Sequence, residues 1–296
     1  MMTMQDQSVR QDAKHNLCRP GTVIGAAIAL CVMAACLSGS ALADTPQDLF
    51  RAPASGLTQT VDHSTWDRLL KAYVKADPSG LNRVDYAAFK AGRHSELKAY
   101  VRQLEKVDPR GLDKAEQFAF LANLYNAKTI DIVLDKYPVK SIKDISLGGG
   151  LVATLTGGPW KAKVVTLQGV ELSLDDIEHT ILRPIFKDPR VHYAVNCASI
   201  GCPNLGTEAF TAAMLNEQLD AAARAYVNHP RGVDVRSDGL VASSIYNWFA
   251  DDFGGTEEAV LSHLKKYAEP ELRERLAGSA SITDYAYDWS LNDIGR

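Results

Sequence analysis

Hydrophobic residues are arranged in two different ways along the chain. Residues 23–37 form an almost uninterrupted apolar run, which is shorter than the roughly 20 apolar residues needed to span a bilayer. Basic residues precede the run, and Ala41 and Ala43 follow it in the small-x-small pattern of a signal peptidase site. We therefore predict a secretory signal peptide over residues 1–43 and a periplasmic or secreted mature protein. Alternatives are an uncleaved anchor, or a lipoprotein attached through Cys36, for which Met33 is atypical.

Beyond this run, the apolar positions follow the periodicities of a folded domain. Residues 44–61 are polar with scattered Pro and Gly and are interpreted as a linker, so that the domain covers residues 62–296. The strongest helical pattern spans residues 114–136 and stops at Tyr137-Pro138. Its apolar residues occur on nearly every side, which is typical of a buried central helix. Asn123 and Asn126 lie three apart on one face of that helix.

The middle and the end of the chain add strands to a mainly helical pattern. Hairpins are predicted for residues 161–167 with 170–172 and for residues 233–236 with 240–242. Further strands are expected at residues 191–196 and 282–289, and a helix at 173–182 that ends before Pro184. Other helices are predicted at residues 64–74, 86–91, 95–104, 211–227, 244–251, 257–267 and 271–276. This order predicts the α+β class: a single mainly helical domain with a small, mostly antiparallel sheet built from hairpins.

Charge and cysteine content narrow the class of protein. The net charge of −4 and the absence of clustered Lys and Arg argue against a nucleic-acid partner. No second apolar stretch of the mature chain is long enough to be a transmembrane segment, and we expect no cofactor. Cys18, Cys31 and Cys36 belong to the predicted signal peptide, which leaves Cys197 and Cys202. In an oxidising compartment these two can form one local disulfide.

Several short motifs occur in a fixed order from about Ser64 onward. They are F-A-F-L-A-N-L-Y-N-A at 118–127, Y-P-V at 137–139, S-L-D-D-I-E-H at 173–179 with I-L-R at 181–183, D-P-R-V-H at 188–192, Asn196-Cys197 with Ser199 and Cys202-Pro203, Trp248 with Asp252-Phe253, and Y-D-W-S-L-N at 287–292. In these motifs the chain resembles the bacterial and plant family called domain of unknown function 547, here as an exported bacterial member. Ala122 departs from the pattern, where a larger residue such as Ile is expected. The resemblance implies a domain without implying a reaction.

The loop after the predicted strand at 191–196 holds the candidate chemistry. In a strand, His192 and Asn196 would share one face. A thiol enzyme needs a cysteine kept as thiolate by a nearby base, which is itself oriented by an amide or a carboxylate. The candidate nucleophiles are Cys197 and Cys202, the candidate bases are His192 and His179, and the orienting amides are Asn123, Asn126 and Asn196.

Each of these residues also has another interpretation. Glu178, His179, His192 and the two cysteines are metal-ligand types, but their spacing matches no zinc pattern, and we expect no metal. Glu178 and Arg183 are either a substrate-orienting or acid–base pair, or a structural ion pair. Asn123, Asn126, Asn196 and Ser199 either line a polar substrate pocket or bind backbone groups. Cys197 and Cys202 can instead be bonded.

Two functional hypotheses therefore stand side by side. The first is a hydrolase or acyl transferase that acts on an envelope substrate through a cysteine-containing polar pocket. The second is a non-catalytic module that binds a peptide, glycan or protein and has a structural disulfide. The sequence leaves open whether the protein is an enzyme.

Overall fold

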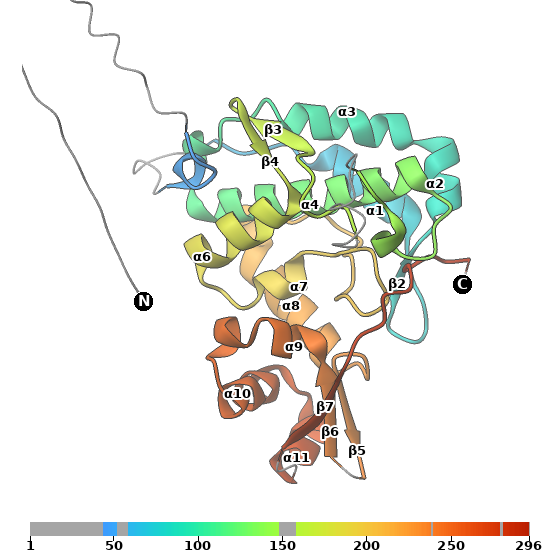
Figure 1. Ribbon diagram of the computed structural model, residues 1–296, viewed down its shortest axis with the longest axis vertical. Coiled ribbons are helices and arrows are strands. Elements are labelled where there is room, and N and C mark those ends of the chain that lie inside the picture. Colours follow the sequence, from blue (N-terminus) through green and yellow to red (C-terminus); the bar gives the residue numbers. More distant parts are fainter. Residues whose placement is uncertain (1–43, 52–58, 148–157, 238, 279–280, 296) are drawn as a thin grey trace, which may run out of the picture. The chain divides into compact units, whose positions relative to one another are not determined.

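The computed structural model describes residues 44–51, 59–147, 158–237, 239–278 and 281–295. The predicted signal peptide lies outside these ranges. Residues 43–296 group into one compact unit, in which helices dominate and the described strands form three small sheets (Figure 1). The α+β prediction is confirmed. Within the described residues, none of the helices combines the length and apolar character required to cross a membrane.

The first half of the unit is built from helices around one long central helix. Its elements are η1 (Asp48–Phe50), α1 (Ser64–Tyr73), β1 (Val74–Ala76), β2 (Asn82–Val84), α2 (Tyr86–Gly92), α3 (His94–Leu104), η2 (Pro109–Gly111), α4 (Lys114–Lys136) and η3 (Ile142–Asp144). Leu49 and Phe50 are fully buried, so part of the segment interpreted as a linker packs into the core. The antiparallel pair β1–β2, which lies between the predicted helices at residues 64–74 and 86–91, was not predicted.

Helix α4 matches its predicted bounds and its predicted central position. It begins after Asp113, whose carboxylate accepts a hydrogen bond from the Glu116 amide at 2.8 Å and so caps the helix. It ends before Tyr137-Pro138, because proline cannot continue a helical hydrogen-bond ladder. Figure 1 shows α4 crossing the middle of the helical part, with α3 running above it. The all-round apolar pattern therefore reflects burial on every side.

The second half alternates short helices with small hairpins. Its elements are β3 (Val165–Leu167), β4 (Val170–Leu172), η4 (Asp176–Leu182), α6 (Arg183–Phe186), α7 (Val191–Ala194), η5 (Ala212–Met214), α8 (Leu215–Val227), β5 (Val233–Arg236), β6 (Gly239–Ser243), α9 (Ser244–Trp248), η6 (Ala250–Phe253), α10 (Glu257–Tyr267), α11 (Pro270–Gly278) and β7 (Ile282–Ala286). Both predicted hairpins are present. Strand β7 pairs parallel to β6, which is a departure from the antiparallel pattern.

The turn of the first hairpin follows directly from its sequence. Gln168 and Gly169 both have positive φ, at 49° and 82°. A two-residue loop of this kind matches the twist of the flanking strands. The cross-strand register of Val165 with Leu172 and of Leu167 with Val170 then turns apolar side chains toward the core.

The predicted strand at residues 191–196 is wrong, because this segment begins as the helical turn α7. The Val191 amide donates to the Asp188 carbonyl at 3.1 Å, and the Val195 amide donates to the Val191 carbonyl at 3.2 Å. A short apolar run fits a buried helical turn as well as a strand, and periodicity does not separate the two. The expected alternation of faces therefore does not hold, and residues 191–196 are all buried.

Two hydrophobic clusters form the core. The first surrounds α4 and includes residues of α1, α3 and η4, while the second lies among α8, β6, α9 and α10. Helix α7 joins them, because Val191 and Ala194 belong to the first cluster and Tyr193 to the second. The junction of the two clusters is also where the candidate site lies.

The C-terminal segment closes the fold by running back along the domain. The Val84 amide donates to the Asn292 carbonyl at 2.8 Å, and the Gly201 amide donates to the Asp288 carbonyl at 2.7 Å. A Cβ atom at position 201 would lie 2.8 Å from the Asp288 nitrogen, so this close approach requires glycine. The segment thereby fixes the loop that carries the two cysteines.

His63 makes the stability of the domain depend on pH. Its Nδ1 atom lies 2.6 Å from the Tyr100 hydroxyl, and its buried Nε2 atom has no hydrogen-bond partner. Burial lowers the pKa of His63 from 6.5 to about 4. Between these two values the unfolded chain binds more protons than the folded one, so stability falls as the pH falls. The shift corresponds to about 3 kcal/mol between pH 7 and pH 4.

The matched variant for this prediction is His63→Asn, which cannot take up a proton. Denaturant unfolding of both proteins from pH 7 to pH 4 isolates the contribution of His63, since other groups titrate equally in both. We expect the stability difference between wild type and variant to shrink by about 3 kcal/mol across this range. A difference that stays constant with pH contradicts the prediction.

Candidate functional site

The segment that carries Glu178 and His179 has an unusual helical geometry. Element η4 is a π-helix, in which the Arg183 amide donates to the Glu178 carbonyl five residues earlier. Ser173 and Asp176 cap its start reciprocally, with the Asp176 amide donating to Ser173 Oγ at 3.0 Å. π-Helical turns are rare and occur frequently at functional sites.

The predicted end of this helix before Pro184 is wrong. The chain continues from η4 into α6, which reaches Phe186. Pro184 lies at the point where the π-helical hydrogen bonding of η4, with the Arg183 amide bonded to the Glu178 carbonyl, gives way to α6. The continuous helix keeps Glu178, His179 and Arg183 on one rigid element.

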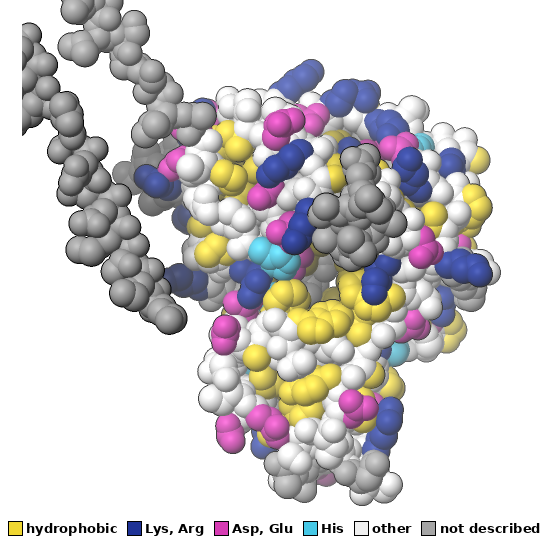
Figure 2. Space-filling view, viewed as in Figure 1, with side chains coloured by type: hydrophobic (Ala, Val, Ile, Leu, Met, Phe, Trp, Pro, Cys, Tyr) yellow, Lys and Arg dark blue, Asp and Glu magenta, His cyan; other side chains and the backbone are white. Residues whose placement is uncertain are grey.

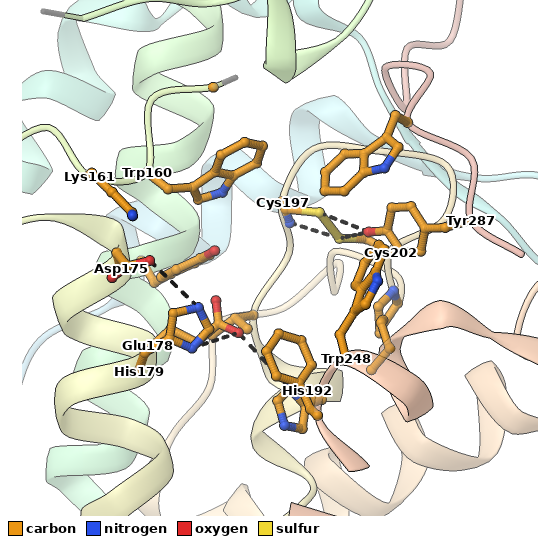
Figure 3. A pocket seen from close by; sticks show the side chains of 17 residues that line it. Trp160, Lys161, Asp175, Glu178, His179, His192, Cys197, Cys202, Trp248 and Tyr287 are labelled. Carbon is orange, nitrogen blue, oxygen red and sulfur yellow. Dashed lines mark hydrogen bonds and ion pairs between the residues drawn. A yellow bond between two sulfur atoms is a disulfide. The ribbon is translucent and has the colours of Figure 1, made fainter. Parts of the chain in front are cut away.

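A pocket of about 290 Å³ lies beside η4. Glu178 and His179 of η4, His192 of α7, and Cys197 and Cys202 of the following loop all line it (Figure 3). Figure 2 shows hydrophobic side chains gathered on this face of the molecule, with a histidine and several basic side chains along their upper edge. Five of the predicted site residues are thus brought to one cavity.

Asp252 holds one of the pocket's histidines from outside the lining. Its Oδ2 atom accepts hydrogen bonds from His192 Nε2 at 2.7 Å and from Arg183 Nε at 2.5 Å. These two contacts, that of His192 first, hold the pKa of the Asp252 carboxyl well below its usual value. Arg183 Nη1 also lies 3.1 Å from His179 Nδ1 and so connects the two histidines. Arg183 therefore pairs with Asp252, and the alternative of a Glu178–Arg183 ion pair is not observed.

Glu178 lies deeper, between the two imidazoles. Its Oε1 atom is 3.9 Å from His179 Nδ1 and 4.0 Å from His192 Nδ1. Burial raises the pKa of Tyr125, and the charge of Glu178 together with a hydrogen bond between them raises it further. Throughout the described ranges, no lysine or arginine forms an ion pair with Glu178.

Aromatic side chains form the opposite wall. Trp289 packs against Trp160, Trp248 and Tyr287, with ring centres 5.6, 5.8 and 4.7 Å apart. Trp248 is 47% exposed despite its size. On the histidine side, the ring of Phe249 stacks on His192 with ring centres 4.4 Å apart and with the planes tilted by 16°. The pocket therefore has an aromatic wall facing a carboxylate.

The two cysteines are joined in a disulfide. Their Cα atoms are 6.3 Å apart. The Tyr287 hydroxyl lies 3.0 Å from Cys197 Sγ and donates to Cys202 Sγ at 3.1 Å, and Ser199 Oγ lies 3.0 Å from the same hydroxyl. Burial raises the pKa of Tyr287. In this form neither sulfur is a thiolate.

The buried amides hold the backbone around the pocket in place. Asn126 donates to the Ala194 carbonyl and accepts from the Asn196 amide, both at 2.8 Å. Asn123 makes the same kind of pair with the carbonyl and amide of Phe210, at 2.8 and 3.0 Å. The Asn196 side chain donates to the Pro203 carbonyl at 2.7 Å and accepts from the Ala198 amide at 2.9 Å. Of the two interpretations of these amides, these contacts fit the structural one.

Several pocket residues were not predicted as site residues. They are Tyr125, Trp160, Trp248, Tyr287 and Trp289. Asp252, which binds His192 from outside the lining, was not predicted either. Trp248, Asp252, Tyr287 and Trp289 nevertheless lie in the family motifs at positions 248, 252–253 and 287–292. Tyr287 and Trp289 reach the pocket because the C-terminal segment folds back, which no local pattern signals.

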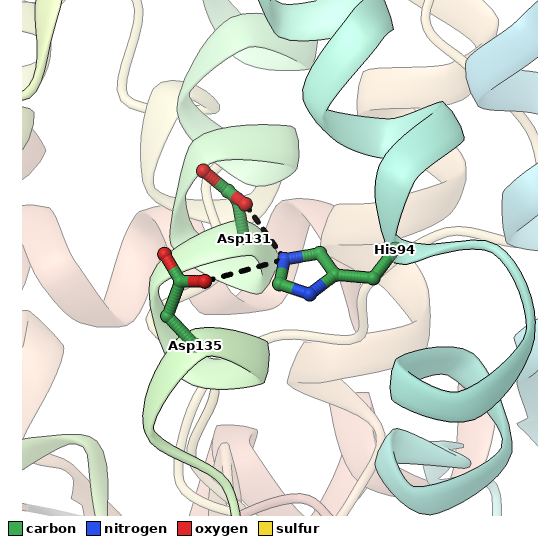
Figure 4. Close-up of side chains that lie close together, drawn as sticks. All are labelled: His94, Asp131 and Asp135. Atoms are coloured by element: carbon green, nitrogen blue, oxygen red, sulfur yellow. Dashed lines mark hydrogen bonds and ion pairs between the residues drawn. The ribbon is translucent and has the colours of Figure 1, made fainter.

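A second group of potential metal ligands lies away from the pocket. His94 Nε2 is 2.8 Å from Asp131 Oδ1 and 3.8 Å from Asp135 Oδ1 (Figure 4). Lys98 Nζ, however, binds both carboxylates at 2.8 and 2.9 Å, and Lys128 Nζ binds Asp131 at 2.8 Å. The ammonium groups already neutralise these carboxylates, so the group is an ion-pair network between α3 and α4.

Comparison with known proteins identifies part of the chain. Residues 109–227 match a family model described as "Protein of unknown function, DUF547". This match runs from η2 to the end of α8 and includes Glu178, His179, His192 and both cysteines. No curated protein and no solved structure matches the chain.

Proposed function

Since the chain belongs to the DUF547 family, whose function is unknown, we propose from the geometry of the pocket that it is an exported, non-catalytic binding module. The proposed ligand is a peptide or glycan of the cell envelope. Export is supported by the signal-peptide pattern of residues 1–43 and by the disulfide, which suits an oxidising compartment.

One observation carries the proposal: a concave pocket has an open aromatic wall, whereas its two histidines are already held by Asp252 and Arg183. A ligand that stacks on Trp160, Trp248 and Tyr287 gains apolar contact from rings that take no part in a reaction. His192, Asp252 and Arg183 are held by mutual hydrogen bonds. Ligand sites of this kind combine apolar walls with a few placed polar groups.

The bonded cysteines also favour binding over thiol catalysis. A nucleophilic cysteine must be a thiolate, and Cys197 and Cys202 are joined to each other. A hydrolase or acyl transferase that used either sulfur would first require this bond to be reduced.

A specific contact favours a second candidate, a hydrolase that does not use sulfur. His192 is oriented by Asp252 at 2.7 Å and presents its other nitrogen to Glu178 at 4.0 Å. A carboxylate next to an oriented imidazole can move protons in acid–base catalysis. In this candidate Glu178 is the general acid or base.

Calorimetric titration with three probes tests the proposal. The probes are a trimer of N-acetylglucosamine, Nα-acetyl-lysine methylamide and Nα-acetyl-norleucine methylamide. We expect at least one to bind, and we expect Trp248→Ala to weaken that binding about tenfold, since an exposed aromatic contact is lost. Absence of binding by all three, or equal binding by the variant, overturns the proposal. Conversion of a bound probe into products overturns the non-catalytic assignment in favour of the hydrolase.

A further inference from the structure

We propose that the group recognised by this pocket is an alkylammonium, such as a lysine side chain, with its cation held by Glu178 between the aromatic rings. This inference rests on the proposed binding function and specifies its ligand class. It follows from the charge at the bottom of the pocket and from the rings that surround it.

The first observation is a buried carboxylate without a basic partner of its own. The Glu178 side chain is 11% exposed, and the nearest basic atoms are two imidazole nitrogens at 3.9 and 4.0 Å. Both imidazoles are already engaged, His192 by Asp252 and His179 by Arg183. A buried charge is unfavourable unless it is paired. A ligand cation would supply the missing partner.

The charged side chains that line the pocket give it a net negative charge, because two are acidic and one is basic. Asp175 adds a second carboxylate, whose closest basic group is His179 Nε2 at 3.8 Å. Lys161 also lines the pocket. Its side chain is exposed and forms no ion pair within the parts of the chain that are described. Inside the pocket an anionic ligand would therefore meet Glu178 and Asp175, while the exposed Lys161 lies among the lining residues and Lys143 lies over the Trp289 ring from outside the lining. A cationic ligand would instead be attracted by both carboxylates.

The second observation is the arrangement of the aromatic rings opposite Glu178. In Figure 3, Trp160, Trp248 and Tyr287 surround the cavity, and Glu178 approaches it from the η4 side. The negative faces of such rings attract ammonium groups, while the apolar ring surface accommodates a methylene chain. The same cluster already has a cation over one ring, because Lys143 Nζ lies 5.1 Å from the centre of the Trp289 ring.

The volume of the pocket favours a single side chain over a larger part of a polymer as the ligand. A pocket of about 290 Å³ lies at the small end of the range for ligand sites, which is roughly 300–1,000 Å³. One extended side chain of four methylenes with a terminal ammonium fits this description. A neutral sugar could stack on the same rings but would leave the Glu178 charge without a partner. The test therefore compares a cationic ligand with a neutral one.

A matched pair of ligands isolates the ammonium group. Nα-Acetyl-lysine methylamide and Nα-acetyl-norleucine methylamide differ in the terminal ammonium and share most of the aliphatic chain. We expect the full-length mature protein to bind the lysine compound at least about tenfold more tightly, and the difference to shrink in 1 M salt. Equal affinity for the two compounds overturns the inference.

A matched pair of variants then assigns the effect to Glu178. Glu178→Gln keeps the size and an acceptor for Tyr125 but removes the charge, and we expect it to abolish the preference for the lysine compound. Glu271→Gln removes an exposed carboxylate on α11, outside the pocket, and is expected to keep the preference. Retention of the preference in Glu178→Gln, with the thermal unfolding curve unchanged, overturns the inference.

The results also separate this inference from the proposed function. Binding of the norleucine compound or the N-acetylglucosamine trimer, with loss of that binding in Trp248→Ala and with no preference for lysine, keeps the binding module and overturns the ammonium assignment. Failure of all probes to bind overturns both. If the wild type prefers the lysine compound and the Glu178→Gln variant does not, the result supports both the binding function and the ammonium ligand.

Discussion

Replacing Asp131 with Asn is expected to lower the free energy of unfolding by about 4 kcal/mol. The Asp131 side chain is 3% exposed and accepts contacts from His94, Lys98 and Lys128, each at 2.8 Å. Burial works against ionisation, but the two lysines and the histidine prevail and lower the pKa of Asp131. Without this carboxylate, Lys128 loses the acidic group that it binds, and His94 and Lys98 keep only the more exposed Asp135. Such unpaired groups destabilise more than the intact pair stabilises.

Urea unfolding followed by circular dichroism measures this loss. The matched control is Asp135→Asn, because Asp135 contacts the same Lys98 but its side chain is 47% exposed. Exposed ion pairs contribute at most about 1 kcal/mol. Similar losses for the two variants would contradict the central place given to Asp131 in this network. The pKa of Asp131 also predicts that its contribution disappears as the pH falls below the usual range of an aspartate.

Replacing Asn126 with Leu is expected to destabilise the domain by about 4 kcal/mol and to weaken ligand binding as well. The amide of Asn126 satisfies the Ala194 carbonyl and the Asn196 amide, both buried, at 2.8 Å. Leucine has a similar size but leaves both backbone groups without a partner, and each unpaired buried group costs about 1–3 kcal/mol. The same two residues connect His192 to the cysteine-containing loop, so the pocket wall should shift.

The measurement pairs urea unfolding with titration of whichever probe binds the wild type. Asn247→Leu is the control, since Asn247 is exposed on α9. We expect this control to change stability by less than about 0.5 kcal/mol, as is usual at exposed positions. A fully stable Asn126→Leu protein would show that the amide bridges are dispensable, and the structural interpretation of the buried asparagines would be wrong.

Long, strongly periodic elements and strands joined by a specific turn were predictable from the sequence, whereas the short buried helix α7 was not. Helix α4 has its predicted bounds because its cap at Asp113 and its stop at Pro138 are local signals. Strands β3 and β4 follow from a turn that positive φ at Gln168 and Gly169 makes specific. Residues 191–196 were misassigned because their apolar character reports burial, while the turn at Asp188 decides the conformation.

The site was predicted in part, and for reasons that can be named. Glu178, His179, His192 and the cysteines were recognised by residue type, and they do line one pocket. The amides were grouped with them because polar residues in an apolar helix indicate a constraint, which is here backbone bonding. The aromatic wall was missed because Trp160, Trp248 and Trp289 are far apart in the sequence and meet only through tertiary packing.

The central claim is that the cavity between Glu178 and the aromatic wall binds a ligand. The chain has four tryptophans, of which Trp160, Trp248 and Trp289 line the pocket, whereas Trp66 is 1% exposed within the first core cluster. An NMR spectrum of the protein with labelled indole nitrogens therefore contains three reporters and an internal reference. On titration with Nα-acetyl-lysine methylamide, we expect the three pocket signals to shift and saturate together while the Trp66 signal stays in place. Unchanged pocket signals, or shifts of Trp66 equal to theirs, would contradict the claim.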